Sequence, residues 1–595
     1  MEVTTAPPDS STASNTMADL ASKAAAKHGE RKALKHKVGG EWRDISYRQL
    51  GETVSEVARG LIDLGLEHGD RVAILSGTRP EWTYANLAIL ASGAVSVSIY
   101  QTNSVEECHY VLEHSECRAV FVENGEQLAK VREVESDLPV LEHVIVFDPP
   151  AEAGDAISLG TLRERGAAHE QSELDARTAA VSRKDHCITI YTSGTTGPPK
   201  GCVVTHGNYR DVTTMIEQTG VIHGDDQTYL FLPLAHSFAK LVQFVLLDLG
   251  GSIAYWQGDV QKIVPDLIEV QPTSFPSVPR MFEKIYTLAR AGAEDIEAMD
   301  EAIELGLTVR RMRTTGEQIS PELQARFEAA DDSLYSNVRG LLGGNIRECV
   351  TGGAPISEEI LAFFYACGVP VMEAYGMTET STAATINTTE ALRFGSVGKP
   401  LPRMEMRVAD DGELLLRGPN IFGGYYRDVK ATREALIDGW LHSGDLGHID
   451  EDGFVFVSGR KKDIIITAGG KNITPSNLEN AIKRSRWVSQ AVVIGDRRPY
   501  LSALITLDPE QTPAFAEQHR IAVDDLSGSE QMRAEIQTHV DTVNASVGRV
   551  EQVKRFTILP ADLTQGTGEL TPTLKVKRHV VEKRFAAEIE ALYAA

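Results

Sequence analysis

The first third of the chain alternates between the hydrophobic patterns of helices and strands. Apolar side chains recur at helical spacing in some segments, while other segments are short, continuously apolar runs typical of buried strands. The predicted helices are 47–64, 82–92 and 105–113, and the predicted strands are 71–75, 95–99 and 119–122. Such βαβα alternation predicts a largely parallel sheet with helices on its faces, and therefore an α/β fold.

The pattern changes further along the chain. Residues 151–185 are polar and rich in Ala and Glu, which is typical of a connecting segment. A second alternating block begins at Cys187. Within it, residues 283–338 are charged, Ala-rich and helical in pattern, which predicts a solvated helical elaboration. Residues 413–457 hold short strand-like runs broken by Gly and Asp.

The composition changes after Gly459. Between Arg460 and Arg486, seven Lys/Arg residues accompany only two acidic ones, in a protein whose formal net charge is −25. We place a domain boundary here, because a chain of 595 residues is too long for one hydrophobic core. The expected units are a large domain of residues 18–459 and a small domain of residues 460–595. On charge alone, the basic cluster is equally a solvated surface or a contact for an anionic ligand.

The acidic composition limits the classes of partner. Nucleic-acid binding usually requires a basic face, so we predict no nucleic-acid partner. No run of eighteen apolar residues occurs, and peripheral contact with the inner face of a membrane stays open. Six scattered cysteines without a C-x-x-C pair fit the reduced thiols of a cytoplasmic protein. Residues 1–17 are rich in Ser, Thr, Pro and Ala without an apolar signal-peptide core, and are expected to form a disordered tail.

A loop rich in glycine and hydroxyl groups follows the apolar run that begins at Cys187. It reads Tyr191-Thr-Ser-Gly-Thr-Thr-Gly-Pro-Pro-Lys-Gly201. Glycine allows backbone amides to face an anion, hydroxyls add donors, and Lys200 adds a positive charge, so the loop is suited to a polyphosphate. It is not a Walker A loop, because Lys200 is followed by Gly201 instead of Ser or Thr. The alternative is an ordinary surface turn.

Residues 191–201 match the first signature of the adenylate-forming superfamily throughout, Tyr/Phe-T-S-G-T-T-G-x-P-K-G. The remaining signatures follow in the family's order, and from about residue 18 onward the sequence most resembles the bacterial long-chain fatty acyl-CoA synthetases. Two segments that carry the long-chain likeness are 469–475 and 570–575. The resemblance implies a large multi-sheet α/β N-terminal domain and a small, mobile α+β C-terminal domain on a hinge.

The same resemblance implies a role for each signature residue. The phosphate loop would bind ATP through Thr192, Ser193, Gly194, Thr195, Thr196, Gly197 and Lys200. The turn Thr351-Gly-Gly-Ala-Pro355 would place Gly352, Gly353 and Ala354 against adenine. In the segment 373–380, the ring of Tyr375 and Gly376 would also meet the nucleotide, Thr378 would contact the α-phosphate, and Glu379 would hold Mg²⁺. Without the signature, a carboxylate such as Glu379 is more often a solvated or salt-bridged surface residue.

The later signatures supply the ribose contacts, the hinge and the catalytic lysine. By resemblance, Asp445 in His442-Ser-Gly-Asp-Leu446 would accept hydrogen bonds from both ribose hydroxyls, and Arg460 would reach the ribose as well. Lys462 falls at the hinge position, and Lys575 in Gly568-Glu-Leu-Thr-Pro-Thr-Leu-Lys575 aligns with the catalytic lysine. Its neighbours Lys577 and Arg578 are alternatives for that role.

His236 lies in Leu232-Pro-Leu-Ala-His236, which resembles a segment that the family places beside the acyl carboxylate. The alternative is a core histidine with a backbone partner.

The function implied is an ATP- and Mg²⁺-dependent long-chain fatty acid:CoA ligase that forms an acyl-adenylate and releases AMP and pyrophosphate. Its substrates would be a fatty acid, ATP and coenzyme A, and a homodimer is left open. Two rival functions are kept: a fatty acyl-AMP ligase that loads a carrier protein, and an inactive homologue that only binds nucleotide and lipid. No inserted segment is evident between Tyr375 and Arg460, which disfavours the first rival.

Overall fold

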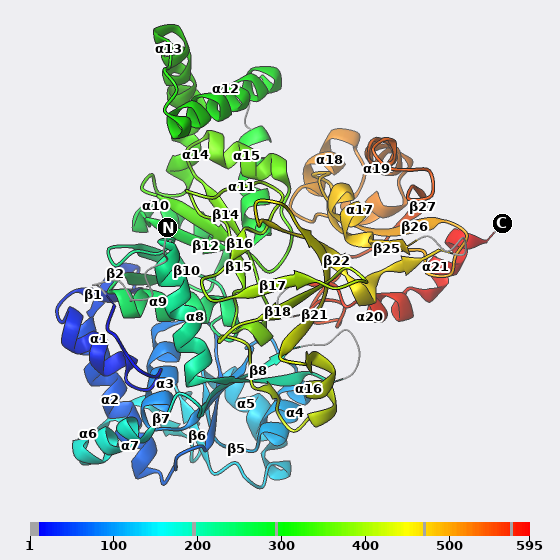
Figure 1. Cartoon of the computed structure of the whole chain (residues 1–595). Coiled ribbons are helices and arrows are strands. Elements are labelled where there is room, and N and C mark those ends of the chain that lie inside the picture. The colour runs from blue at the N-terminus through cyan, green and yellow to red at the C-terminus, as the bar shows by residue number, and fades with distance from the viewer. Residues whose placement is uncertain (1–10, 193–197, 292–294, 468–471, 572–574, 595) are drawn as a thin grey trace.

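The computed structural model describes residues 11–192, 198–291, 295–467, 472–571 and 575–594. Its large domain contains two long sheets and a smaller one, and its small domain lies to one side, as the yellow to red ribbon of Figure 1 shows. In the described part of the chain, no helix is both long and apolar enough to cross a bilayer. The expected α/β class is confirmed.

The first sheet contains the predicted βαβα repeat. Its eight strands follow the order β19-β9-β8-β4-β3-β5-β6-β7, and strands β8 to β7 along this order are parallel. Their bounds are β3 (Arg71–Leu75), β4 (Val95–Ile99), β5 (Cys117–Val122), β6 (His143–Val146), β7 (Ile157–Ser158), β8 (His186–Thr192), β9 (Lys200–Thr205) and β19 (Gly424–Tyr425). The helices on this side are α2 (Tyr47–Asp63), α3 (Pro80–Ala91), α4 (Val105–Ser115) and α5 (Gly125–Val134). The elements predicted for this region are therefore confirmed.

The supposed connecting segment contains two helices, α6 (Leu159–Ala168) and α7 (Gln171–Ala180), which corrects the expectation for residues 151–185. Helix α6 packs on α2 through a glycine contact. A Cβ on Gly166 would lie 1.8 Å from the carbonyl oxygen of Glu56, so only glycine permits this approach. Leu162 is fully buried in the same interface. The mostly polar composition of this segment hid the helix α6, because only Leu159, Leu162 and Gly166 on one face of it are buried.

The second sheet has nine strands in the order β16-β15-β14-β13-β12-β10-β11-β1-β2. Their bounds are β1 (Lys32–Val38), β2 (Glu41–Ser46), β10 (Gln227–Leu230), β11 (Ser252–Tyr255), β12 (Ser274–Ser277), β13 (Glu348–Thr351), β14 (Val371–Tyr375), β15 (Thr385–Ile386) and β16 (Lys399–Pro400). Strands β11, β10, β12, β13 and β14 are parallel to one another. Helices α1 (Leu20–His28), α8 (His206–Thr219), α9 (Ser237–Leu249), α10 (Ile263–Val270) and α15 (Glu358–Ala366) complete this part.

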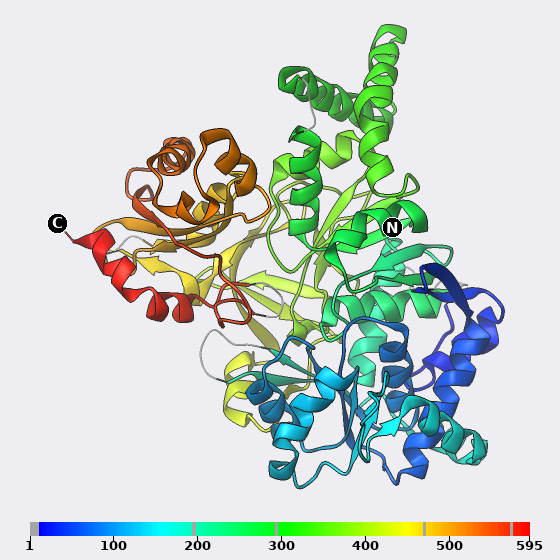
Figure 2. The same cartoon turned by 180° about the vertical axis from the view of Figure 1, so that it is seen from behind.

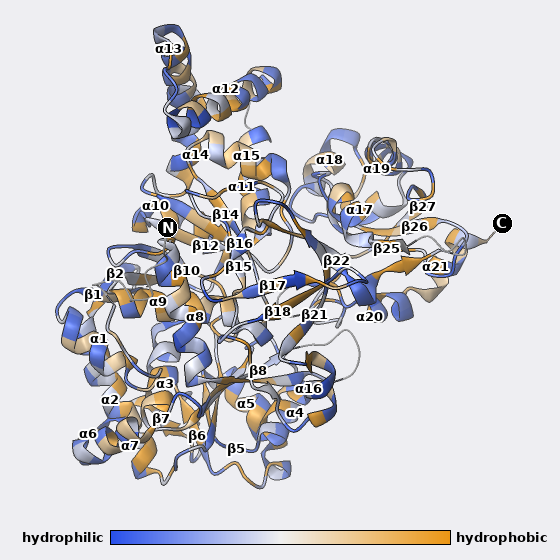
Figure 3. Cartoon of the chain, in the orientation of Figure 1, coloured by the Kyte–Doolittle hydropathy of each residue, from blue (hydrophilic) through white to orange (hydrophobic). Residues whose placement is uncertain are grey.

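The helical elaboration predicted for 283–338 projects from the top of the large domain in Figure 1. Its helices are α11 (Pro279–Ala291), α12 (Ile296–Thr315), α13 (Pro321–Ala330) and α14 (Ser336–Leu341). Hydrophilic residues cover much of α12 and α13 in Figure 3, as expected for a solvated projection.

A third sheet connects the large domain to the small one. It pairs β17 (Glu405–Val408), β18 (Glu413–Arg417), β21 (Trp440–Ile449) and β20 (Leu436–Ile437), with β22 (Val455–Arg460) added on β21. Helix α16 (Val429–Ala435) precedes β20. The short strands predicted for 413–457 are thus present.

The small domain is built on a three-stranded sheet of β25 (Val488–Ile494), β26 (Leu501–Leu507) and β27 (Val553–Ile558). A hairpin of β23 (Ile465–Ile466) and β24 (Asn472–Ile473) precedes it. Its helices are α17 (Pro475–Ile482), α18 (Thr512–His519), α19 (Glu530–Ala545), α20 (Arg578–Arg584) and α21 (Ala586–Tyr593). Figure 2 shows this unit from behind, beside the large domain.

Residues 11–17, expected to belong to a disordered tail, pack against the large domain instead. The Ser11 hydroxyl donates to the carboxylate of Asp248 on α9, and the N–H of Met17 donates to Nδ1 of His206 (3.2 Å). These side chains are buried. The partners lie about 200 residues away along the chain, so local composition could not reveal them. Residues 1–10 of the expected tail lie outside the described part.

Candidate active site

The candidate site lies at the carboxyl ends of the parallel strands of the nine-stranded sheet. Tyr375 is the last residue of β14, Gly352 follows the end of the neighbouring β13, and His236 follows β10. In open α/β sheets, ligands bind at this edge, because the loops that follow parallel strands meet there. Gly353 and Ala354 continue the loop after β13.

A tight turn carries Gly376, Thr378 and Glu379 beyond the end of β14. A Cβ on Gly376 would lie 1.9 Å from the carbonyl oxygen of Thr382, so glycine is required where the chain folds back. A short 3₁₀ helix, Thr378–Thr380, follows, with Thr378 buried and Glu379 half-buried. The signature glycine therefore determines where the threonine and the carboxylate stand.

Asp445 receives two partners that the sequence placed in separate signatures. Tyr375 donates its hydroxyl to Oδ2 (2.7 Å), and Nε of Arg460 lies 3.0 Å from Oδ1. Asp445 and Arg460 face each other across the antiparallel strands β21 and β22. Burial, and next the Asp445 charge, raise the pKa of Tyr375 well above its ordinary value, so this phenol stays a donor.

The phosphate loop connects β8 to β9. Thr192 ends β8 and donates its hydroxyl to the carbonyl of Lys200 (3.4 Å), which begins β9. The hairpin thus fixes both ends of the loop. Residues 193–197, which include the predicted Ser193, Gly194, Thr195, Thr196 and Gly197, lie outside the described residues.

His236 is the N-cap of α9, where its Nδ1 accepts the N–H of Phe238 (3.2 Å). Burial lowers its pKa to about 4, and the charges of Lys575 and Lys240 lower it in the same direction. The ring is therefore neutral near pH 7 and carries its proton on Nε2. His236 has the backbone contact expected of a structural histidine, yet its other nitrogen remains a donor beside the strand ends.

Lys575 comes from the small domain. Leu570 forms an isolated antiparallel bridge with Val576, the residue after Lys575, and the backbone N–H of Lys575 donates to the Thr571 hydroxyl (3.0 Å). The surrounding protein lowers the pKa of Lys575, the nearby charge of Arg460 adds to that, and the charges of Asp445 and Glu379 oppose it. The lysine therefore lies within electrostatic reach of the residues at the strand ends.

Comparison with known proteins agrees with this arrangement. A family model described as "AMP-binding enzyme" matches residues 21–426, and one described as "AMP-binding enzyme C-terminal domain" matches residues 462–595. The chain belongs to the AMP-binding enzyme family.

Relatives of known name extend over nearly the whole chain. The long-chain-fatty-acid–CoA ligase FadD15 of Mycobacterium bovis is 39% identical over 565 residues, covering 93% of each chain. The long-chain-fatty-acid–CoA ligase ACSBG2 of Xenopus laevis is 34% identical over 609 residues, covering 95% of this chain and 82% of its own.

Solved structures share the fold. The A domain of carboxylic acid reductase from Segniliparus rugosus, in complex with AMP and a co-purified carboxylic acid, has a TM-score of 0.78 at 21% identity and covers 98% of this chain and 95% of its own. The anthranilate CoA ligase AuaEII, in complex with anthranoyl-AMP, has a TM-score of 0.73 at 21% identity and covers 99% and 100%.

The structure separates the three basic candidates near the C-terminus of this AMP-binding enzyme. Arg578 donates to Glu479 (2.5 Å) and to the carbonyl of Val493, within the small domain. Nζ of Lys577 lies 3.9 Å from Glu107 on α4. The charge of Lys575 lowers the pKa of the strand-end residue His236, while Lys577 and Arg578 contact Glu107 and Glu479, which favours Lys575 as the catalytic lysine.

Two other predicted site residues, Lys462 and Ala354, are exposed to solvent. Lys462 is exposed in the 3₁₀ turn Lys461–Asp463 after β22, a position suited to a hinge. Ala354 is also exposed. The segment 469–475, used for the long-chain likeness, lies partly outside the described residues, which resume at 472, and so does 570–575, where 572–574 are not described.

Sequence reasoning missed two residues beside the site. Tyr425, on β19, donates its hydroxyl to Oε1 of Glu379 (2.7 Å). Lys240, four residues after His236 on α9, is fully buried, donates to Ser98 (2.8 Å), and has its pKa lowered by burial to about 7. A lysine within an apolar helix was a signal for the second; for the first, the partner lies 46 residues away and no local pattern indicated it.

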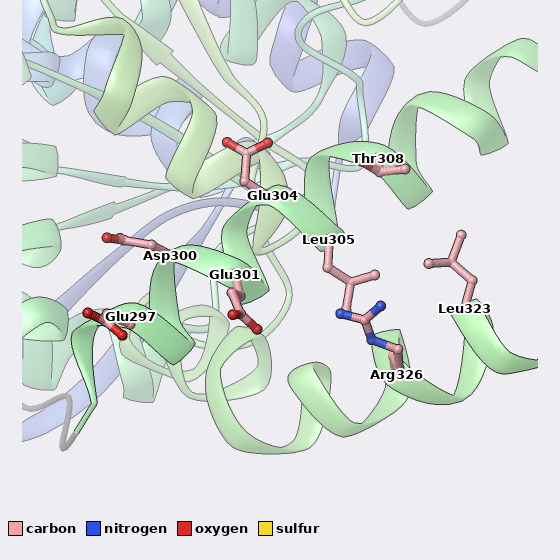
Figure 4. Close-up of a pocket in the computed structure, with 8 residues that line it drawn as sticks. All are labelled: Glu297, Asp300, Glu301, Glu304, Leu305, Thr308, Leu323 and Arg326. Carbon is pink, nitrogen blue, oxygen red and sulfur yellow. The ribbon is translucent and has the colours of Figure 1, made fainter.

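A hollow of about 780 Å³ lies elsewhere, between α12 and α13. Figure 4 shows its lining residues, Glu297, Asp300, Glu301, Glu304, Leu305, Thr308, Leu323 and Arg326. The four acidic residues come from α12 on the solvated projection, far from the strand ends. This hollow is not part of the candidate active site.

Proposed function

We propose that this AMP-binding enzyme is an ATP- and Mg²⁺-dependent long-chain fatty acid:CoA ligase that works through an acyl-adenylate. The observation that carries the proposal is the position of Lys575. The charge of this small-domain lysine lowers the pKa of His236 in the large domain, and the charges of Asp445 and Glu379 act in turn on the pKa of the lysine. The names of the relatives that match most of the chain support the same activity.

In the first step, a carboxylate oxygen of the fatty acid attacks the α-phosphorus of ATP, and the bond to pyrophosphate breaks. Two anions meet, so cations and oriented donors are needed where charge accumulates. Lys200 would neutralise the phosphates of the leaving group, and Lys575 would neutralise the charge on the α-phosphoryl oxygens. The neutral His236 would donate from Nε2 to the fatty-acid carboxylate, which orients it without a proton transfer.

Asp445 would bind the ribose, because a carboxylate can accept from two hydroxyls. Its present donor, Tyr375, would then present its ring to adenine while it keeps the carboxylate oriented. Gly352, Gly353, Ala354 and Gly376 would line the base.

The residues present fit a magnesium ion that arrives with ATP. The described residues contain no group of three or more His, Cys, Asp or Glu that could hold a metal alone. Mg²⁺ usually keeps water and phosphate oxygens as ligands and takes one or two carboxylates. Glu379 would supply that carboxylate, with Thr378 against the α-phosphate. The ion would offset phosphate charge as pyrophosphate leaves.

In the second step, the thiol of coenzyme A attacks the acyl carbonyl, and AMP leaves with the oxygen that formed the mixed anhydride. The small domain, residues 460–595, would swing about Lys462 to withdraw Lys575 and present a different face. The basic residues between Arg460 and Arg486 would then meet the coenzyme A phosphates. One site would thus serve two half-reactions.

The test is ATP-dependent acyl-CoA formation with saturated acids from acetate to about C20, following AMP, pyrophosphate and thioester. We expect all three products in equal amounts, with a maximum at long chains, since a longer apolar chain gains about 0.8 kcal/mol per buried methylene. Pyrophosphate without a thioester would indicate the acyl-AMP ligase instead. Nucleotide binding without any turnover would indicate the inactive homologue.

A further inference from the structure

Tyr425 stands between two charged groups of the candidate site. It belongs to β19, which pairs antiparallel with β9 so that Tyr425 faces Cys202. Its backbone N–H donates to the hydroxyl of Thr432 on α16 (2.9 Å). The backbone of Tyr425 is thus fixed on two sides, by pairing with β9, the strand that begins with Lys200, and by the hydrogen bond to α16. This fixed backbone sets the direction of the side chain.

The hydroxyl of Tyr425 is directed at Glu379. It lies 2.7 Å from Oε1, a short hydrogen bond to a carboxylate. A phenol donates through its O–H and an ionised carboxylate can only accept, so Tyr425 is the donor in this bond.

The ring of Tyr425 faces Lys200. Nζ of Lys200 lies 5.0 Å from the ring centroid, within the range of a cation–π interaction. Lys200 and Glu379 carry opposite charges and both turn to the same tyrosine instead of to each other. A direct ion pair between Lys200 and Glu379 would compete with the binding of phosphate by Lys200 and with the binding of Mg²⁺ by Glu379.

We propose that Tyr425 is a positioning residue that keeps Glu379 and Lys200 apart and each directed toward ATP. Its hydroxyl orients the carboxylate, and its ring holds the ammonium group until phosphate arrives. The inference rests on the proposed function only for the roles of Glu379 toward Mg²⁺ and of Lys200 toward phosphate.

Calorimetric ATP binding without fatty acid tests the proposal and needs no turnover. The quantity compared is the ratio of the ATP Kd in EDTA to the ATP Kd with Mg²⁺. Tyr425→Phe keeps the ring and loses the hydroxyl, so we expect an unchanged Kd in EDTA. The ratio should fall about 10-fold or more, because loss of a residue that orients a metal ligand typically costs 10- to 100-fold.

Tyr425→Leu also removes the ring and allows Lys200 to pair with Glu379. We expect the Kd in EDTA to rise about 5-fold above that of Tyr425→Phe, because the phosphates must then compete with Glu379 for Lys200, and an ion pair of this kind is worth up to about a factor of five. Tyr426→Phe, an adjacent tyrosine whose ring packs on His114 and His186, is the matched control, with wild-type values expected. Unchanged thermal unfolding midpoints show that each variant is folded.

A double mutant separates positioning from a general structural role. In a Glu379→Gln background, Tyr425→Phe should cause no further loss of the Mg²⁺-dependent ratio, since no carboxylate is left for the tyrosine to orient toward Mg²⁺. Tyr425→Phe with a wild-type ratio, or full additivity with Glu379→Gln, would overturn the proposal. If these effects appear in a protein that forms no acyl-CoA, the proposed function fails while the inference on Tyr425 stands.

Discussion

The two domains hold their parts of the candidate site in different ways. In the large domain, the residues are fixed by backbone pairing: Asp445 lies on β21, which pairs with β22 up to Arg460 at the domain boundary, and Tyr375 ends β14. Lys575 of the small domain lies instead outside the named helices and strands, next to the isolated bridge between Leu570 and Val576. Among the described residues, the hydrophobic clusters divide between the domains as well, with those of the small domain formed only by residues from 465 onward.

The described polar contacts between the domains include three charged pairs. Arg280 on α11 donates to Asp508 (2.5 Å), Lys284 lies 2.8 Å from Glu510, and Lys577 lies 3.9 Å from Glu107. Each pair has at least one partner at the surface, and surface ion pairs are worth about 0–1 kcal/mol each. A rigid half that binds nucleotide and a weakly attached half that carries the lysine would suit a reaction in which the lysine is needed for one step only.

The largest effect is expected from Lys575→Ala. Loss of this charge should slow acyl-adenylate formation at least about 100-fold, as the loss of a group that stabilises developing charge does. Thioester formation from supplied acyl-adenylate should stay near wild type, because the proposed swing of the small domain would withdraw the lysine before that step. Rapid-quench assays of the two half-reactions measure both rates.

Lys583→Ala, at an exposed position on α20, is the matched control and should leave both rates unchanged. Equal loss of both half-reactions in Lys575→Ala would remove the distinction between the two domains.

In the large domain, Asp445→Asn should weaken ATP binding about 10- to 100-fold. The change removes the negative charge and replaces one of the two acceptor oxygens by an NH₂ donor, and hydrogen bonds to charged groups contribute about 1.5–3 kcal/mol. Equilibrium ATP titration measures the loss. Asp411→Asn, which removes the exposed partner of Lys461, is the control with wild-type affinity expected. A normal ATP affinity in Asp445→Asn would exclude Asp445 from the nucleotide site.

The interior of the large domain provides a pH-dependent test. Glu217 lies against Arg210 (2.9 Å) and is fully buried, and burial raises its pKa to about 8. The folded state therefore holds this proton more tightly than the unfolded state. The stability it contributes is complete below about pH 4.5 and is lost as pH rises to about 8, at roughly 1.4 kcal/mol per pH unit.

Glu217→Gln should remove that loss, so that between pH 6 and pH 8 the unfolding midpoint of the large domain falls less than in the wild type. The transition of the small domain should not change. Scanning calorimetry at several pH values measures both transitions, and Glu328→Gln, an exposed substitution on α13, is the control. An identical pH dependence in the wild type and Glu217→Gln would contradict the raised pKa.

The smallest effect concerns the contact between the domains. Arg280→Ala combined with Lys284→Ala should lower the rate of adenylation about 2- to 5-fold relative to thioester formation, if these two ion pairs, whose basic side chains are exposed, hold the orientation with Lys575 over the site. The difference should shrink at high salt. Arg417→Ala, which breaks an exposed pair with Glu405 inside the large domain, should not alter the ratio. No change in the ratio at low salt would mean that these pairs do not hold the orientation.

The sequence predicted the site residues of the large domain better than those of the small domain. Asp445 and Arg460 were predicted because each lies in a local signature, and the β21–β22 pairing then brings them together. The sequence alone did not show which of Lys575, Lys577 and Arg578 is the catalytic residue, because neighbouring basic residues give the same sequence pattern. The structure distinguishes them by the partners that their side chains contact. Tyr425, and the burial of residues 11–17, were missed because their partners are remote in sequence and hydrogen bonds of this kind leave no periodic signal.

The most direct test of the central claim follows the oxygen of the fatty-acid carboxylate. With a long-chain acid labelled with ¹⁸O in its carboxylate, and with ATP, Mg²⁺ and coenzyme A present, mass spectrometry of the products locates the label. An acyl-adenylate requires one ¹⁸O in the phosphate of AMP and none in pyrophosphate, because the attacking oxygen stays on the α-phosphorus when the thiol displaces AMP. Acyl-CoA formation with unlabelled AMP would contradict the account.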